Sequence, residues 1–256
     1  MRTNFLRLIA FILLYPYIVG FTSDSTSVNP WSVLFGFGGG SYSVINRDCN
    51  GNVLGSAKIP FNDFGAGVEY SEKNILVGVK TGIHSASAAT LISRYPGASG
   101  PAAYDTTYYS ASQIVYANPY AGLKFRYFEF RIGGLFAGGD IGGTFNLNGE
   151  TVSAPSGYIR VGSEKGFLVS ASLFNNLPLM SAGGIFDMGI GVCLNEQTNT
   201  SLWGGVGILD LENSGTIVKY STTVFDDYFL TFTGGIGEES KSAMLSVMVK
   251  TKLNFW

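Results

Sequence analysis

From Trp31 onward, hydrophobic and polar residues alternate with a period of two along most of the chain. In residues 128–136, for example, the phenylalanines and Ile132 occupy one face, whereas Glu129 and Arg131 occupy the other. Successive side chains of a β-strand point to opposite faces, whereas the faces of a helix repeat about every 3.6 residues. The pattern therefore predicts strands with one apolar face and one face of glycine and charge.

The same alternation recurs along the chain in about twelve runs, with ten to fourteen as the range of the count. The connections between the runs alternate in length. Some are tight turns, such as Ser71–Asn74 and Ser163–Phe167, whereas the segments 46–60, 86–112 and 138–155 are long. Short turns at one end and long loops at the other are typical of an up-and-down antiparallel barrel in a membrane. The predicted strands are 31–45, 61–71, 74–85, 113–127, 128–137, 156–163, 167–174, 183–193, 200–209, 216–225, 228–236 and 243–255.

A soluble antiparallel sandwich would also alternate, so the composition of each face has to distinguish the two folds. The polar face of a sandwich meets water and is rich in charge. Here that face consists mostly of Gly, Ser and Thr, which favours a narrow enclosed lumen. Aromatic residues gather near the tight turns, where they would form an interfacial girdle: Tyr70, Phe125, Tyr127, Phe128, Phe167 and Tyr228. The sequence therefore predicts an all-β transmembrane barrel.

Composition excludes several other classes. Of the 256 residues, 46% are hydrophobic and only 13% are charged, which is incompatible with a disordered chain. The net charge of −2 gives no reason to expect a nucleic-acid partner. Cys49 and Cys193 are too far apart in sequence for a paired-thiol zinc site, and we expect them at opposite ends of the barrel without a disulfide bond between them.

The N-terminus has the order of a secretory signal peptide. Arg2 and Arg7 precede the apolar run from Leu8 to Val19. This run is well short of the roughly 20 residues that a membrane-spanning helix needs. We expect residues 1–20 to be a signal peptide that is removed, 21–30 to be a short N-terminal segment, and 31–256 to form a single barrel domain.

The last predicted strand ends in the sequence AMLSVMVKTKLNFW. Its alternating apolar positions and terminal aromatics resemble the C-terminal targeting strand of bacterial outer-membrane β-barrel proteins. Trp256 stands one residue beyond the aromatic on which the pattern of that class normally ends. The resemblance implies a location in the bacterial outer membrane, contact with its lipid, and recognition by the outer-membrane assembly machinery, with Leu253, Phe255 and Trp256 as the assembly signal.

Motifs for catalysis or cofactor binding are weak. The chain has no Gly-Lys pair for a phosphate-binding loop, and the glycine-rich stretch 138–143 lies in a predicted connection. The single histidine, His84, has the parity of the lumen face, whereas a hydrolase of the outer-membrane phospholipase type needs its serine and histidine to face lipid together. We therefore expect no enzyme, no cofactor and no metal site.

Charge on the glycine face gives the main functional indication. Eight cations and three carboxylates occupy this face, a formal sum of +5. Rings of Lys and Arg favour anions, so the leading hypothesis is a narrow passive pore for small solutes with weak anion preference. The alternatives are a closed barrel whose outer loops contact a partner or brace the membrane, and, more remotely, a membrane-embedded hydrolase. The predicted lumen charge band consists of Lys80, Lys124, Arg126, Arg131, Arg160, Lys219, Lys250, Lys252, Glu69, Glu129 and Asp187.

Overall fold

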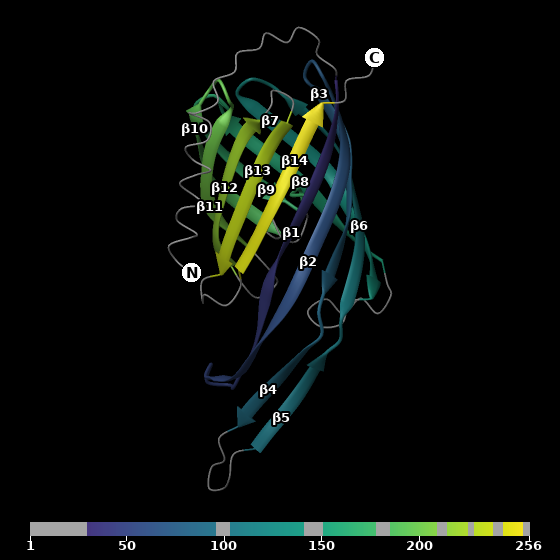
Figure 1. The fold of residues 1–256 in the computed structure, drawn as a ribbon, viewed down its shortest axis with the longest axis vertical. Coiled ribbons are helices and arrows are strands. Elements are labelled where there is room, and N and C mark those ends of the chain that lie inside the picture. The colour runs from purple at the N-terminus through teal and green to yellow at the C-terminus, as the bar shows by residue number, and fades with distance from the viewer. Residues whose placement is uncertain are drawn as a thin grey trace.

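The fold is described from a computed structural model for residues 30–95, 103–140, 151–177, 185–208, 214–224, 228–237 and 243–252. These residues form fourteen β-strands, of which twelve close into one antiparallel barrel (Figure 1). Among the same residues, no helix is long and apolar enough to cross a membrane. The predicted fold class and the count of twelve barrel strands are therefore confirmed.

The barrel order is β1-β14-β13-β12-β11-β10-β9-β8-β7-β6-β3-β2, and β4 and β5 form a separate two-stranded ribbon. The strands are β1 (Trp31–Arg47), β2 (Val53–Glu72), β3 (Ile75–Ala86), β4 (Ala89–Tyr95), β5 (Ala103–Tyr109), β6 (Ser112–Lys124), β7 (Phe128–Asp140), β8 (Val152–Gly162), β9 (Phe167–Leu173), β10 (Phe186–Asn195), β11 (Thr200–Ile208), β12 (Ser214–Val224), β13 (Tyr228–Gly237) and β14 (Ala243–Lys252).

The first and last strands close the barrel. β1 pairs with β14 from Ser32 opposite Lys252 to Ser41 opposite Ala243, and on its other side with β2. Closure leaves no unpaired edge within the barrel wall, because each wall strand is hydrogen-bonded to a neighbour on both sides. Such a wall can stand in lipid, where an unpaired backbone group would cost several kcal/mol.

The outward face of the wall is apolar, as the alternation predicts. Val77, Ile132 and Val206 on three different strands are all exposed, whereas their chain neighbours on the other face point inward. Near the tight turns, aromatic side chains cover the outside and include the predicted girdle residues Phe125, Tyr127, Phe128, Phe167 and Tyr228, together with Trp31, whose ring lies edge-on to Tyr70 at 5.0 Å.

The inward face is rich in glycine because large aromatic rings lie flat against the wall. A Cβ added to Gly82 would stand 2.3 Å from Oη of Tyr116, and one added to Gly78 would stand 2.5 Å from Oη of Tyr120. Both tyrosines are almost completely buried. The glycines therefore provide the room in which these rings fill the interior, which explains the unusual glycine content of the lumen face.

The structure corrects two predicted loops. In the segment 46–60, β1 continues to Arg47 and β2 begins at Val53, so the long loop is only the turn between two extended strands. In the segment 86–112, β4 and β5 pair as a ribbon beside this extension, beyond the barrel end opposite the tight turns (Figure 1). Asn46 Nδ2 donates hydrogen bonds to Ser93 Oγ at 2.9 Å and to Tyr95 Oη at 3.1 Å, which fastens the ribbon to the β1–β2 extension.

Several predictions fall on residues outside the described ranges. These include the signal peptide at 1–20, almost all of the segment 21–30, and the assembly-signal residues Leu253, Phe255 and Trp256. They remain predictions.

The two cysteines lie at opposite ends of the barrel and are both free thiols. Cys49 is exposed in the turn that ends the β1–β2 extension, whereas Cys193 lies on the inward face of β10 beside a tight turn. We expect a membrane-impermeant maleimide applied to intact cells to label Cys49 at least tenfold faster than Cys193. Single Cys→Ser variants identify the labelled site, and equal labelling rates would contradict this strand order.

Candidate functional site

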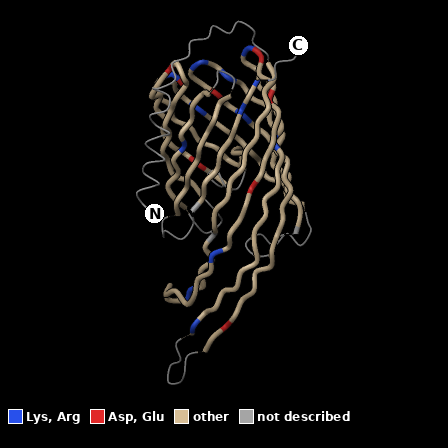
Figure 2. The backbone as a smooth tube through the Cα atoms, viewed as in Figure 1, with Lys and Arg blue, Asp and Glu red and all other residues tan. Residues whose placement is uncertain are grey.

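The barrel interior holds a network of ion pairs, here called the charge network, made of Glu69, Lys124, Glu129, Arg131, Arg160, Glu164 and Lys250. More charged residues lie in the half of the barrel towards the tight turns than in the other half (Figure 2). At one pole of the network, the Glu69 carboxylate accepts from Arg131 Nη1 at 3.0 Å, from Tyr120 Oη at 2.9 Å and from Lys250 Nζ. Because Glu69 is on β2 and Lys250 on β14, their pair passes over β1 at the closure of the barrel.

Glu129 is the other pole of the network. Its carboxylate lies 2.6 Å from Nη2 of Arg131 and 3.5 Å from Nη2 of Arg160, and the Glu129 side chain is only 3% exposed. Glu164, in the turn between β8 and β9, extends the network to Lys124 at 3.1 Å. Desolvation raises the pKa of the Glu164 carboxyl, but attraction from Lys124 and Arg160 outweighs it and holds the pKa below its usual value.

A short segment after β9, Phe174–Leu177, enters the barrel interior and is here called the crossing segment. On one wall, Asn118 of β6 donates to the carbonyl of Phe174, and Lys80 of β3 donates to the carbonyl of Asn175 and, at 3.1 Å, to its Oδ1. The backbone turns inward at Phe174, which has a φ of 46°. Residues other than glycine, asparagine and aspartate rarely adopt such a value.

The crossing segment is also held on the opposite wall. Asn176 Nδ2 donates to Oδ2 of Asp187 on β10 at 2.8 Å, and Lys219 of β12 donates to the same carboxylate at 2.7 Å and to Asn176 Oδ1 at 3.3 Å. Leu177 is 3% exposed and lies against Gly65 of β2, which is beside β3 on the first wall. Polar contacts on both walls therefore hold this segment across the lumen.

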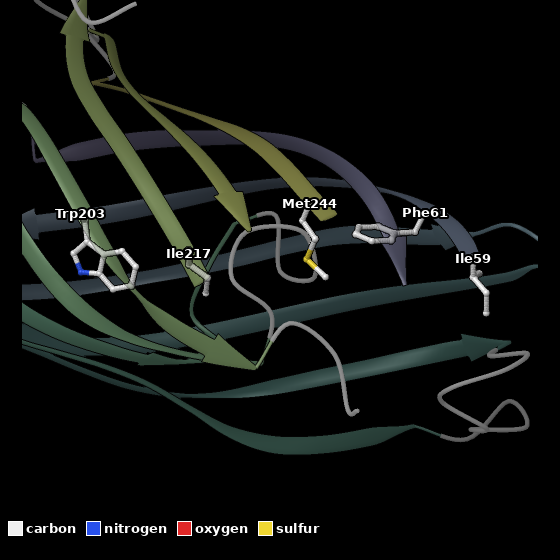
Figure 3. Close-up of a cluster of buried hydrophobic side chains, with 5 residues drawn as sticks. All are labelled: Ile59, Phe61, Trp203, Ile217 and Met244. Carbon is white, nitrogen blue, oxygen red and sulfur yellow. The ribbon is translucent and has the colours of Figure 1, made fainter. Parts of the chain in front are cut away.

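The half of the lumen away from the charge network contains a cluster of apolar side chains. Side chains from four strands project into the interior and pack as one cluster (Figure 3). The cluster consists of Ile59, Phe61, Trp203, Ile217 and Met244, each no more than 7% exposed.

The structure separates the predicted lumen charges into groups. Lys124, Arg131, Arg160, Lys250, Glu69 and Glu129 meet in the charge network, whereas Lys80, Lys219 and Asp187 hold the crossing segment. Arg126 lies outside both groups: it is exposed in the turn between β6 and β7, with its guanidinium 5.0 Å from the ring of Tyr127. Lys252 is exposed at the end of β14.

Sequence reasoning missed most of the neutral residues that complete the interior. Tyr120, Asn118 and Asn175 contact the charged groups or the crossing segment, and Glu164 joins the network from a turn. Tyr120 could have been found from the alternation, because it lies two and four residues before Gly122 and Lys124 and so shares their inward face. No signal marked the crossing segment. His84 is buried on the lumen side, with its ring 5.1 Å from that of Phe61, and does not face lipid.

A closed antiparallel barrel with an apolar exterior, an aromatic girdle, tight turns at one end and a charged interior defines an outer-membrane-type β-barrel, the class that includes the porins. Neither a scan against protein-family models nor a search of curated proteins finds a match. Among solved structures, the chain is similar to OprB of Pseudomonas putida, determined at low pH, with 6% sequence identity over 86% of this chain and 91% of that chain and a TM-score of 0.25.

Proposed function

We propose that this chain is a closed barrel of the bacterial outer membrane that presents its projecting strands to a partner or braces the membrane. The observation that supports a closed lumen is that several of its charged groups are buried and bonded to other groups of the interior. Glu69, Glu129, Lys80 and Asp187 are each no more than 4% exposed, whereas groups that line a water-filled channel stay in contact with water.

Two further features favour the closed state. Unpairing a buried charge costs about 3–5 kcal/mol, so the charge network resists any widening that would separate its members. The crossing segment occupies the interior between β3 and β12, and both walls hold it. The proposal includes export with removal of residues 1–20, insertion with the long connections facing outward, and contact with outer-membrane lipid and the assembly machinery.

A narrow pore with weak anion preference is the second candidate. Its support is that three lumen lysines retain contact with water: the side chains of Lys124, Lys219 and Lys250 are 37%, 19% and 30% exposed. Such a cationic lining would raise the local potential for anions in a low-dielectric wall.

Planar-bilayer recording distinguishes the two candidates. We expect the refolded wild-type protein to give no stable conductance steps, because the crossing segment and the charge network fill its lumen. The variant Lys80→Ala with Lys219→Ala removes the lysine contacts that hold the crossing segment on both walls, and we expect frequent openings. The matched control is Lys58→Ala, an exposed lysine on the β1–β2 extension, which should behave as the wild type.

Insertion is checked independently by the shift in gel mobility between unboiled and boiled protein. Steady ohmic conductance from well-inserted wild-type protein would contradict the closed barrel and favour the pore. In that case, reversal potentials in a salt gradient measure the anion preference, and Lys250→Glu with Lys252→Glu should reduce or invert it.

A further inference from the structure

In the ribbon of β4 and β5, β4 is fastened to the β1–β2 extension, whereas β5 is exposed. On β4, Leu91 and Ser93 are buried, and Ser93 accepts the hydrogen bond from Asn46 of the β1–β2 extension. On β5, every residue from Ala103 to Tyr108 is exposed. In the described part of the chain, β5 pairs with β4 alone. Within the described residues, its outer edge therefore has no strand beside it.

The hydrogen-bonding groups of this edge can be assigned. The backbone N–H of Thr106 donates to Oδ1 of Asp105 at 2.8 Å. Ladder bonds alternate along an antiparallel strand, so an N–H that bonds a local side chain instead of β4 belongs to the set that points outward. The outward set is then Tyr104, Thr106 and Tyr108, spaced two residues apart, which is the spacing that another antiparallel strand requires.

A row of outward N–H and C=O groups is satisfied by another extended strand. β5 lacks the lysine or proline residues that usually protect such an edge. A two-stranded ribbon is by itself only marginally stable, and a third strand would stabilise it. The chemistry of the edge thus specifies an extended polypeptide as its partner.

The sequence of β5 is complementary to itself. In an antiparallel pair centred on Thr106, the two Thr106 residues face each other, Tyr104 faces the second copy's Tyr108, and Asp105 faces the second copy's Thr107. Aromatic pairs and threonine pairs across strands are each worth about 0.2–1 kcal/mol, and no like charges are opposed. We propose that β5 is a self-association strand, which joins two copies of this chain into a four-stranded sheet outside the barrel.

Disulfide trapping of the full chain in detergent tests the pairing. In a Cys49→Ser, Cys193→Ser background, Thr106→Cys places two thiols on opposed residues with Cα atoms about 5.5 Å apart, within the range that a disulfide spans. We expect mild oxidation to convert most of this variant to a covalent dimer. Thr90→Cys, exposed on β4 and one strand further from the edge, is the matched control and should stay monomeric.

A second variant tests the edge without cysteine chemistry. Thr106→Pro removes the outward N–H but no ladder bond to β4, so the barrel and ribbon should persist. Sedimentation of the detergent-purified protein should show self-association at least tenfold weaker than for the wild type. The proposal is overturned if the wild type is monomeric, if Thr106→Cys and Thr90→Cys crosslink equally, or if Thr106→Pro dimerises like the wild type. Binding of a foreign extended peptide by a monomeric protein would likewise overturn it.

Discussion

Replacing Glu69 with alanine is expected to destabilise the barrel by about 1.5–3 kcal/mol, because it removes a buried carboxylate that several side chains share. Arg131, Lys250 and Tyr120 all contact this carboxylate, and Arg131 alone would keep a second acceptor in Glu129. The measurement is the free energy of unfolding in guanidinium, in detergent micelles, followed by tryptophan fluorescence and gel mobility. Glu69→Gln keeps an acceptor for Tyr120 but no charge. Its free energy of unfolding should therefore lie between those of the wild type and Glu69→Ala.

The control for this prediction is Glu196→Ala. Glu196 is an exposed glutamate in the turn between β10 and β11. Its loss should change the free energy of unfolding by no more than about 0.5 kcal/mol, as is usual for surface substitutions. If Glu69→Ala and Glu196→Ala destabilise the barrel equally, the buried pairs do not brace it.

The second large effect is expected for Gly205→Ala on β11. An added Cβ would stand 2.5 Å from the ring of Trp203 and 2.3 Å from the carbonyl oxygen of Met188 on the neighbouring strand. Because the backbone of a closed wall cannot move away, we expect a loss of about 3 kcal/mol, at the upper end of the usual cost of overpacking. Thermal unfolding followed by circular dichroism measures the loss.

Its chain neighbour provides the control. Gly204 faces outward, and an added Cβ would meet no atom within 4 Å. Gly204→Ala should therefore be neutral or slightly stabilising, because alanine loses less backbone entropy than glycine on folding. If both variants lose similar stability, these glycines are needed for their backbone conformation and not to make room for the ring of Trp203.

The barrel strands could be predicted because lipid imposes one rule on them. Outward residues such as Ile132 and Val206 are exposed on the wall and must be apolar, so each wall strand alternates against its glycine and charged positions. The extensions of β1 to Arg47 and of β2 back to Val53 were not predicted, because this rule applies only where a strand contacts lipid. Beyond the barrel both faces of a strand can be polar, and exposed residues such as Lys58 break the alternation.

The interior was less predictable. Parity places Glu69 and Arg131 in the lumen, but it does not show which carboxylate each cation reaches, because that depends on register and on strands distant in sequence. The crossing segment has no periodic pattern, so nothing in its sequence shows that it turns into the barrel. Inward apolar residues such as Phe61 and Ile217 contradict the simple rule that the inner face is polar.

The pair between Lys250 and Glu69 joins residues 181 positions apart. It can form only once β14 has come to lie beside β1, so it forms with the closure of the barrel and not within any hairpin. Once formed, it acts as a clasp across the seam between the two ends of the sheet, because parting the seam would take Lys250 away from the buried Glu69 carboxylate. The clasp therefore affects the lifetime of the native state: it slows the opening of the seam and leaves the early formation of hairpins unchanged.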